Sequence, residues 1–341
     1  MSDIALRVST PLPARESFVQ AFRWMLLARL LEEKLANLYR AGKINGGVFL
    51  GKGQEALSAS LGMALQKGDI FAPLIRDQAG RLAFGEEILD AVRTYLGSKL
   101  GPMRGREGNV HRGSLREGRY AMISHLGAMI SAVCGGLMAR RFQGQTGVVG
   151  ATCVGDGCTS TGAFHEALNL AAVEKLPLVL IVANNQFAYS TPNDREFACT
   201  NLVDRALGYG IEGHTVDATE LDACLDVVGR AVARARGGGG PQMVVATLLR
   251  LAGHGEHDDA AYIPQALKDS PAGRDCLRVA ECALLERAWA SAADLEAWRE
   301  ATLLQVEEAV ATVQREPAPD PAEETWCALS TPQLDDTFAA C

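Results

Sequence analysis

The sequence predicts an α/β protein with a parallel sheet, flanked by helices on both faces and extended by helices at both ends. The first observation is an alternation of segments with helical periodicity and short apolar runs. The second is the run LPLVLIVA at 176–183, because a strand covered on both faces is continuously apolar. The third is a strand–turn–helix–strand pattern over residues 148–185, which is one βαβ unit.

The N-terminal third begins with a loose arm over residues 1–14. Apolar residues then recur at helical spacing over 16–41, which predicts a helix. The glycine-rich segment 42–54 predicts a loop, and a second helix is expected over 54–65. DIFAPLI at 69–75 is typical of a short buried strand.

The middle of the chain contains a polar stretch without periodicity at 101–127, and long loops of this kind tend to be functional or disordered. Further helices are expected over the stretch AMISAVCGGLMARRF and over 220–236, and PQMVVATLL at 241–249 predicts a strand. After residue 263 the pattern is mostly helical. We therefore divide the chain into an N-terminal arm and helix (1–45), an α/β domain (46–264) and a C-terminal helical region with a tail (265–341).

The composition excludes several classes of protein. Of the 341 residues 48% are hydrophobic, enough for a sizeable core, and the net charge of −8 argues against a nucleic-acid partner. No apolar run approaches the roughly 20 residues of a membrane span, and the first residues lack the pattern of a signal peptide. The nine cysteines are scattered without a CxxC pair, which favours free thiols and a cytoplasmic location.

Two polar turns frame the βαβ unit. Asp156 lies in a Gly-Asp-Gly turn after the first strand, and Asn184 and Asn185 follow the second. We expect Thr159 or Ser160 to cap the intervening helix. Ligands of open α/β sheets bind beyond the carboxyl ends of the strands, so the pattern indicates a Mg²⁺-bridged diphosphate site. Either turn alone is also a common structural feature.

A Gly-Asp-Gly turn with Asn-Asn about 30 residues later resembles the thiamine diphosphate-binding motif. The wider sequence resembles the alpha subunit of the decarboxylating first component of 2-oxoacid dehydrogenase complexes, over roughly residues 44–264. The segments that carry the resemblance occur in the order of that family and include GQEALSASLGMAL, GREGNVHRGS, MISHLGAMISAVCGG, ANNQFAYSTP and LRLAGHGEHDDAAYIP. The resemblance implies the thiamine diphosphate-binding fold.

The resemblance also implies roles for individual residues, which stay expectations here. Mg²⁺ would be bound by Asp156, Asn185 and the carbonyl oxygen of Phe187. The cofactor would be contacted by Arg76 and the backbone N–H groups of Gly157 and Cys158 at the diphosphate, by the backbone of Ser124 and Leu126 at the aminopyrimidine ring, and by His254. His254 and His111 would be the catalytic residues.

Simpler interpretations of these residues remain open at this point. His254 and His257 with Asp258 and Asp259 could form a small metal site. Arg76 could belong to a surface ion pair, and His111 could be a loop residue without a task.

The implied activity is oxidative decarboxylation of a 2-oxo acid, with transfer of the acyl group to a lipoyl disulfide. The family's activating glutamate belongs to the beta subunit, and we find no second βαβ block here that could supply it. We therefore expect a beta partner, two chains of each kind, and a lipoyl-bearing acyltransferase component. The N-terminal helix, expected to be exposed, and the glycine-rich segment are the candidate assembly surface.

The substrate is not determined by these patterns. AYSTP and GHGEHDD favour a branched-chain 2-oxo acid, and pyruvate and acetoin are alternatives. Ile75 replaces the family's usual Tyr, and Ala183 its usual Arg or Glu. These departures motivate a catalytically weak scaffold or regulatory chain as a second hypothesis. A nucleotide-binding enzyme is a third, although the chain has no GxGxxG motif or P-loop.

Overall fold

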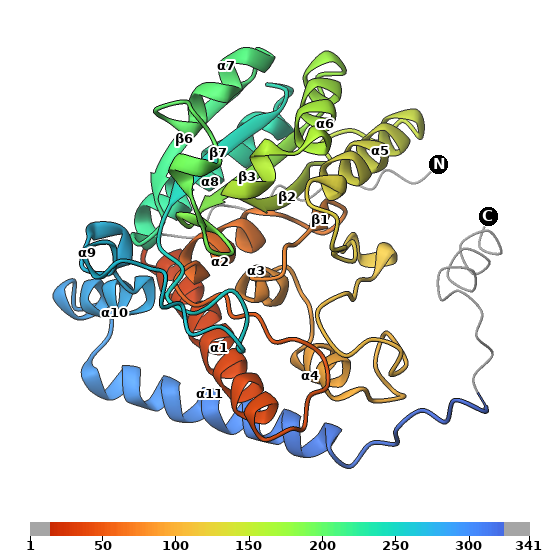
Figure 1. The fold of residues 1–341 in the computed structure, drawn as a ribbon, viewed down its shortest axis with the longest axis vertical. Coiled ribbons are helices and arrows are strands. Elements are labelled where there is room, and N and C mark those ends of the chain that lie inside the picture. Colours follow the sequence, from red (N-terminus) through yellow and green to blue (C-terminus); the bar gives the residue numbers. More distant parts are fainter. Residues whose placement is uncertain (1–13, 324–341) are drawn as a thin grey trace.

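The computed structural model describes residues 14–323 and contains a five-stranded parallel sheet (Figure 1). The strands lie in the order β1-β2-β3-β7-β6. Their bounds are Ile70–Ala72, Gly150–Gly155, Leu178–Asn184, Gln242–Thr247 and Glu212–Asp217, respectively. The α/β class and the parallel sheet are confirmed.

The expected βαβ unit is present, and its two strands are direct neighbours. Gly155 at the end of β2 is in register with Ala183 of β3, and Asn184 is in register with Thr247 of β7. The turns that follow these strands therefore meet at one edge of the sheet. This is the edge at which open α/β sheets bind ligands.

Alternate residues along β3 enter two separate hydrophobic clusters. Val179 and Ile181 pack with residues of α1 (Ala14–Arg40), α2 (Glu55–Ala64) and α8 (Leu221–Arg236). Leu178 and Leu180 pack with residues of α5 (Ala128–Phe142) and α6 (Gly162–Val173). Because successive side chains point to opposite faces of a strand, each face of the sheet carries its own helices.

Helix α1 occupies almost the predicted range, but its environment differs from our expectation. Glu16 in the first turn and Arg40 in the last complement the helix dipole. The helix contributes Phe22, which is 1% exposed and packs on Trp298 at 6.1 Å between ring centroids. Fourteen of its 27 residues are buried. The expectation of an exposed helix available for assembly is wrong, because α10, α11 and α2 cover it.

Several elements lacked a usable signal in the sequence. Strand β6 buries only Val216, so its pattern is polar, as an edge strand permits. The helices α3 (Gln78–Ala83) and α4 (Ile88–Leu96) are short. So is α7 (Arg205–Tyr209), as are the paired strands β4 (Phe187–Ala188) and β5 (Thr191–Pro192). A periodicity needs about 11 residues to be recognised.

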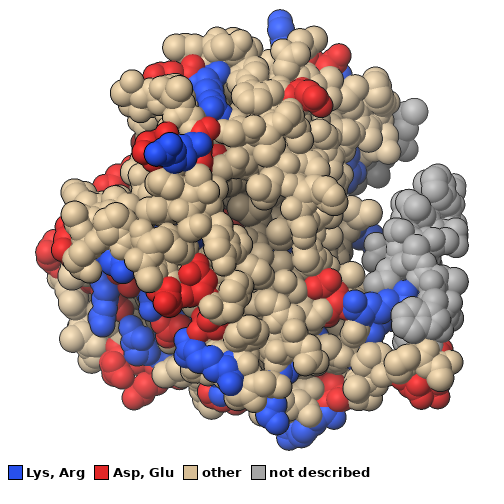
Figure 2. Space-filling model, viewed as in Figure 1, with Lys and Arg blue, Asp and Glu red and all other residues tan. Residues whose placement is uncertain are grey.

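The C-terminal part is helical as expected, with α9 (Gln265–Lys268), α10 (Cys276–Glu286) and α11 (Ala292–Val313). A capping box of Ser291 and Asp294 starts α11, which lies across α1 and α4 (Figure 1). Within residues 14–323 no helix is long and apolar enough to cross a membrane. On the face drawn in Figure 2, acidic and basic side chains are interspersed, and the centre carries little charge.

Candidate active site at the carboxyl edge of the sheet

Strand β2 leads into a 3-10 turn, Asp156–Ser160, before helix α6 begins at Gly162. The helix is capped by Thr161, whose hydroxyl oxygen accepts from Phe164 N at 3.3 Å. The prediction of Thr159 or Ser160 as the cap is therefore wrong. Those two hydroxyls instead donate to the carbonyl oxygens of Asp156 and Glu196, at 2.6 Å each, which holds the turn in place.

Asp156 is 1% exposed, and its carboxylate is only half satisfied. Oδ1 accepts from Gly157 N at 3.0 Å, whereas Oδ2 is buried without a hydrogen-bond partner in the described structure. Burial, followed by the nearby Glu196, raises the pKa of Asp156 to about 7. An unpartnered buried carboxylate oxygen costs free energy unless a cation satisfies it, so the position fits a metal ligand.

The other two expected metal ligands lie on the adjacent turn. Asn185 is 7% exposed, and its Oδ1 accepts from Phe187 N at 3.4 Å. Gln186 between them adopts a left-handed φ of 76°, which reverses the chain after β3. Phe187 O accepts from Arg250 Nη1 at 3.3 Å. A carboxylate, an amide and a backbone carbonyl are all hard oxygen donors, the ligand type of Mg²⁺.

The expected diphosphate turn is shaped by the close approach of two chain segments. A Cβ atom added to Gly157 would lie 2.3 Å from Ala188 Cβ, so this position requires glycine. Gly155 has no neighbour within 4 Å of such an atom. Cys158 is 2% exposed and faces a cavity described below. The backbone is therefore tightly packed on one side of the turn and open on the other.

Arg76 follows β1 and is 6% exposed, so the surface ion-pair interpretation is wrong. Its guanidinium donates to Leu50 O at 2.8 Å and to His254 O at 2.6 Å. Burial, followed by repulsion from Arg250, lowers the pKa of Arg76 to about 10. Two guanidinium groups close enough to repel each other form a site that favours an anion.

Arg250 is a candidate functional residue that our sequence analysis did not select. It is 3% exposed, follows β7 and donates to Phe187 O, Tyr189 O and Tyr262 Oη. The sequence feature that could have identified Arg250 is its position directly after an apolar strand. Arg76, Asp156, Asn185 and Arg250 thus follow four neighbouring strands at one edge.

His254 lies in the loop after β7, between two aromatic rings. Its ring centroid is 4.5 Å from that of Tyr189 and 5.5 Å from that of Phe49. Burial, then the charges of Arg76 and Arg250, lower the pKa of His254 to about 4. The imidazole is therefore neutral at pH 7, so one ring nitrogen can donate a hydrogen bond and the other can accept one.

The interpretation of this loop as a small metal site is wrong. The carboxylate of Asp258 accepts from His254 N, Ala260 N and Tyr262 Oη, and that of Asp259 accepts from Ala261 N. Both acids therefore shape the loop. Across residues 14–323 no group of three or more His, Cys, Asp or Glu side chains is arranged to hold a metal.

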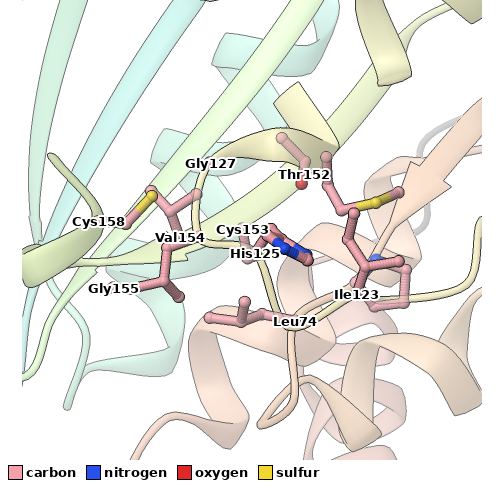
Figure 3. Close-up of a pocket in the computed structure, with 12 residues that line it drawn as sticks. Leu74, Ile123, His125, Gly127, Thr152, Cys153, Val154, Gly155 and Cys158 are labelled. Carbon is pink, nitrogen blue, oxygen red and sulfur yellow. The ribbon is translucent and has the colours of Figure 1, made fainter. Parts of the chain in front are cut away.

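His111 and Ser124 lie in the long polar segment and contact each other. Ser124 Oγ is 3.3 Å from His111 Nε2, and His111 Nδ1 is 3.2 Å from Glu107 Oε1. Leu126 is 53% exposed and lines a cavity of about 20 Å³ together with Cys158. Figure 3 shows residues of the segment 123–127 interleaved with residues of β2 around this cavity. The structure thus brings the expected ring-binding segment against the expected diphosphate turn.

Comparison with known proteins identifies the family of the chain. The family model described as "Dehydrogenase E1 component" matches residues 23–322. The alpha subunit of acetoin:2,6-dichlorophenolindophenol oxidoreductase of Cupriavidus necator is 34% identical over 325 residues, which cover 95% of this chain and 97% of the relative.

Two further relatives carry other activities in their names. The pyruvate dehydrogenase E1 component subunit alpha of Rhizobium meliloti is 30% identical over 311 residues, 91% of this chain and 89% of the relative. The 2-oxoisovalerate dehydrogenase subunit alpha of Bacillus subtilis is 33% identical over 261 residues, which cover 74% of this chain and 78% of the relative. The chain therefore belongs to the dehydrogenase E1 component family, as an alpha subunit of the 2-oxoacid dehydrogenase type.

Proposed function

We propose that this chain is the alpha subunit of a thiamine diphosphate- and Mg²⁺-dependent enzyme that oxidatively decarboxylates a 2-oxo acid and passes the acyl group to a lipoyl disulfide. The observation that carries the proposal is the unpartnered, buried Oδ2 of Asp156. It lies at the strand edge where Asn185, Arg76 and Arg250 also gather. A buried acidic oxygen without a hydrogen-bond partner, near two guanidinium groups that favour an anion, fits a metal-bound diphosphate.

The residues divide the binding task by their chemistry. Asp156, Asn185 and the Phe187 carbonyl would hold Mg²⁺, and Arg76 with the N–H groups of Gly157 and Cys158 would hold the diphosphate. Ser124 and Leu126 would bind the aminopyrimidine ring through their backbone. When bound, thiamine diphosphate supplies the carbon nucleophile and the electron sink that decarboxylation needs.

The two histidines would take part in hydrogen bonding and proton transfer at the substrate. His254 is neutral at pH 7, so its ring N–H can donate a hydrogen bond to the oxygen of the substrate's keto group. His111 is oriented by Ser124 and Glu107 on its two ring nitrogens. Both ring nitrogens are therefore engaged, so a hydrogen bond from His111 to the substrate or its product would replace the one to Ser124.

The assembly is proposed from the family. The three relatives described above are named as alpha subunits, which supports a beta subunit as partner. We propose two chains of each kind and a lipoyl-bearing acyltransferase as the acceptor component, in the cytoplasm. Because much of α1 is covered by other helices of the chain, the glycine-rich segment 42–54 is the assembly surface that we propose.

Three substrates have similar support: two are 2-oxo acids, and the third, acetoin, has no carboxylate and would be cleaved at a carbon–carbon bond without decarboxylation. Relatives at 30% to 34% identity are named for acetoin, pyruvate and 2-oxoisovalerate. The branched-chain preference that we drew from two loop segments therefore has no more support than pyruvate or acetoin. One methylene changes the discrimination in an apolar pocket by only about 1–3 kcal/mol, so an assay must decide.

The test is reduction of an artificial electron acceptor by the full-length chain, alone and mixed with its beta chain. Thiamine diphosphate and Mg²⁺ are supplied with pyruvate, acetoin or 3-methyl-2-oxobutanoate. We expect activity only in the mixture, loss of activity in Asp156→Ala and His254→Ala, and full activity in Asp226→Ala, whose carboxylate is exposed on α8. A stable assembly that neither binds the cofactor nor turns over any substrate would refute the proposal and favour the scaffold hypothesis.

A further inference from the structure

Most of the buried acceptor oxygens without a hydrogen-bond partner in the described residues lie in the Gly-Asp-Gly turn and in the segment 193–196, whose Glu196 faces that turn. Within residues 14–323, four buried side-chain oxygens have no hydrogen-bond partner. Three of them belong to Asp156, Asn193 and Glu196. Buried polar atoms are nearly always satisfied, so a local group of unsatisfied acceptors points to a donor or a cation that binds there.

Glu196 is fixed against this turn by two hydrogen bonds. Its side-chain Oε1 accepts from Ala188 N at 2.7 Å, and its main-chain oxygen accepts from Ser160 Oγ at 2.6 Å. Its Oε2 is the unpartnered atom, and a Cβ atom added to Gly157 would lie 3.7 Å from it. The free oxygen of Glu196 therefore faces the turn that contains Asp156.

The hydrogen bond to Ala188 N has a consequence for the adjacent carbonyl. Ala188 N and the carbonyl of Phe187 belong to one peptide group, and that carbonyl is the third proposed Mg²⁺ ligand. A carboxylate that accepts from the N–H polarises the peptide and increases the negative charge on its oxygen. Groups that hydrogen-bond to a metal ligand in this way orient the ligand and change its affinity for the metal.

We propose that Glu196 is a positioning residue of the cation site, which holds the Phe187–Ala188 peptide through Oε1 and places a second carboxylate beside Asp156 through Oε2. This inference rests on the proposed function, because it assumes that Asp156, Asn185 and the Phe187 carbonyl bind Mg²⁺. Two carboxylates at one buried turn repel each other when both are ionised, and a divalent cation between them removes this repulsion.

The test is a Mg²⁺ titration of the assembled alpha and beta chains at saturating thiamine diphosphate. Binding is measured by calorimetry. Glu196→Gln keeps an oxygen acceptor for Ala188 N but removes the charge, and Glu196→Ala removes both. We expect the Mg²⁺ concentration for half-maximal cofactor binding to rise about 10-fold in Glu196→Gln and further in Glu196→Ala, as for other outer-shell substitutions. Asp194→Asn, an exposed acid on the same segment, should match the wild type.

A second measurement separates this role from a purely structural one. Unfolding in EDTA shows whether each variant folds, and Glu196→Gln should be at least as stable as the wild type because it removes one of two repelling acids. Wild-type Mg²⁺ dependence in Glu196→Ala would overturn the inference while leaving the proposed function intact. Absence of Mg²⁺-dependent cofactor binding in the wild type itself would instead overturn the proposed function.

Discussion

Glu32 offers the sharpest test of the electrostatics of this fold. It lies in α1, is 5% exposed, and its Oε2 accepts from Gly51 N at 2.8 Å. Burial, followed by the charge of Glu55, raises the pKa of Glu32 from 4.5 to about 8. The perturbation is Glu32→Gln, which keeps an acceptor for Gly51 and removes the ionisable group.

The direction of the pH dependence follows from the linkage between proton binding and folding. The folded pKa is raised, so the folded state binds the proton more tightly than the unfolded state does. The contribution of Glu32 to stability is therefore greatest at low pH and is lost as the pH rises from about 4.5 to about 8. A shift of roughly 3.5 units corresponds to about 5 kcal/mol once the pH exceeds both values, and to about 3 kcal/mol at pH 7.

The assay is urea unfolding of the wild type and Glu32→Gln between pH 4 and pH 9, in the absence of cofactor. We expect the free energy of unfolding of the variant, relative to the wild type, to increase along this range and to level off above pH 8. The control is Glu33→Gln, which removes a partly exposed ion pair with Lys52 and should change stability by less than about 1 kcal/mol at any pH. A pH-independent difference for Glu32→Gln would refute the reasoning.

Three further predictions concern packing and local structure, and each is measured by thermal or urea unfolding. Gly157→Ala should lower stability by about 1–3 kcal/mol because its new Cβ would lie 2.3 Å from Ala188 Cβ, whereas Gly155→Ala should be tolerated; equal effects would contradict the packing argument. Phe22→Ala should cost about 3–5 kcal/mol because the ring is fully buried, and a cost below 1 kcal/mol would show that α1 is not part of the core. Ser291→Ala should cost about 0.5–2 kcal/mol through loss of the α11 cap, and an unchanged stability would mean that the capping box does not form.

Much of the architecture could be predicted because local patterns agree with the final packing. The run 176–183 is apolar at nearly every position, which is typical of a strand covered on both faces, and most of it lies in β3. The Gly-Asp-Gly and Asn-Asn turns follow adjacent parallel strands, so their convergence at one edge was a consequence of strand direction. The helix cap was misplaced because a 3-10 turn separates β2 from α6, and three neighbouring hydroxyl residues offer similar local signals.

The sequence by itself determined the α/β class, the βαβ unit, the family and the residues expected at the metal and the diphosphate, because these depend on periodicity and on short motifs. The tertiary structure alone decided which residues from distant segments complete the site. Arg250 repels Arg76 across 174 positions of chain, and Glu196 meets the Gly157 turn, only because β1, β2, β3 and β7 end at the same edge. The tertiary structure likewise decided how far α1 is buried. An amphipathic pattern shows that one face of a helix is covered, but not how much of the helix its neighbours enclose.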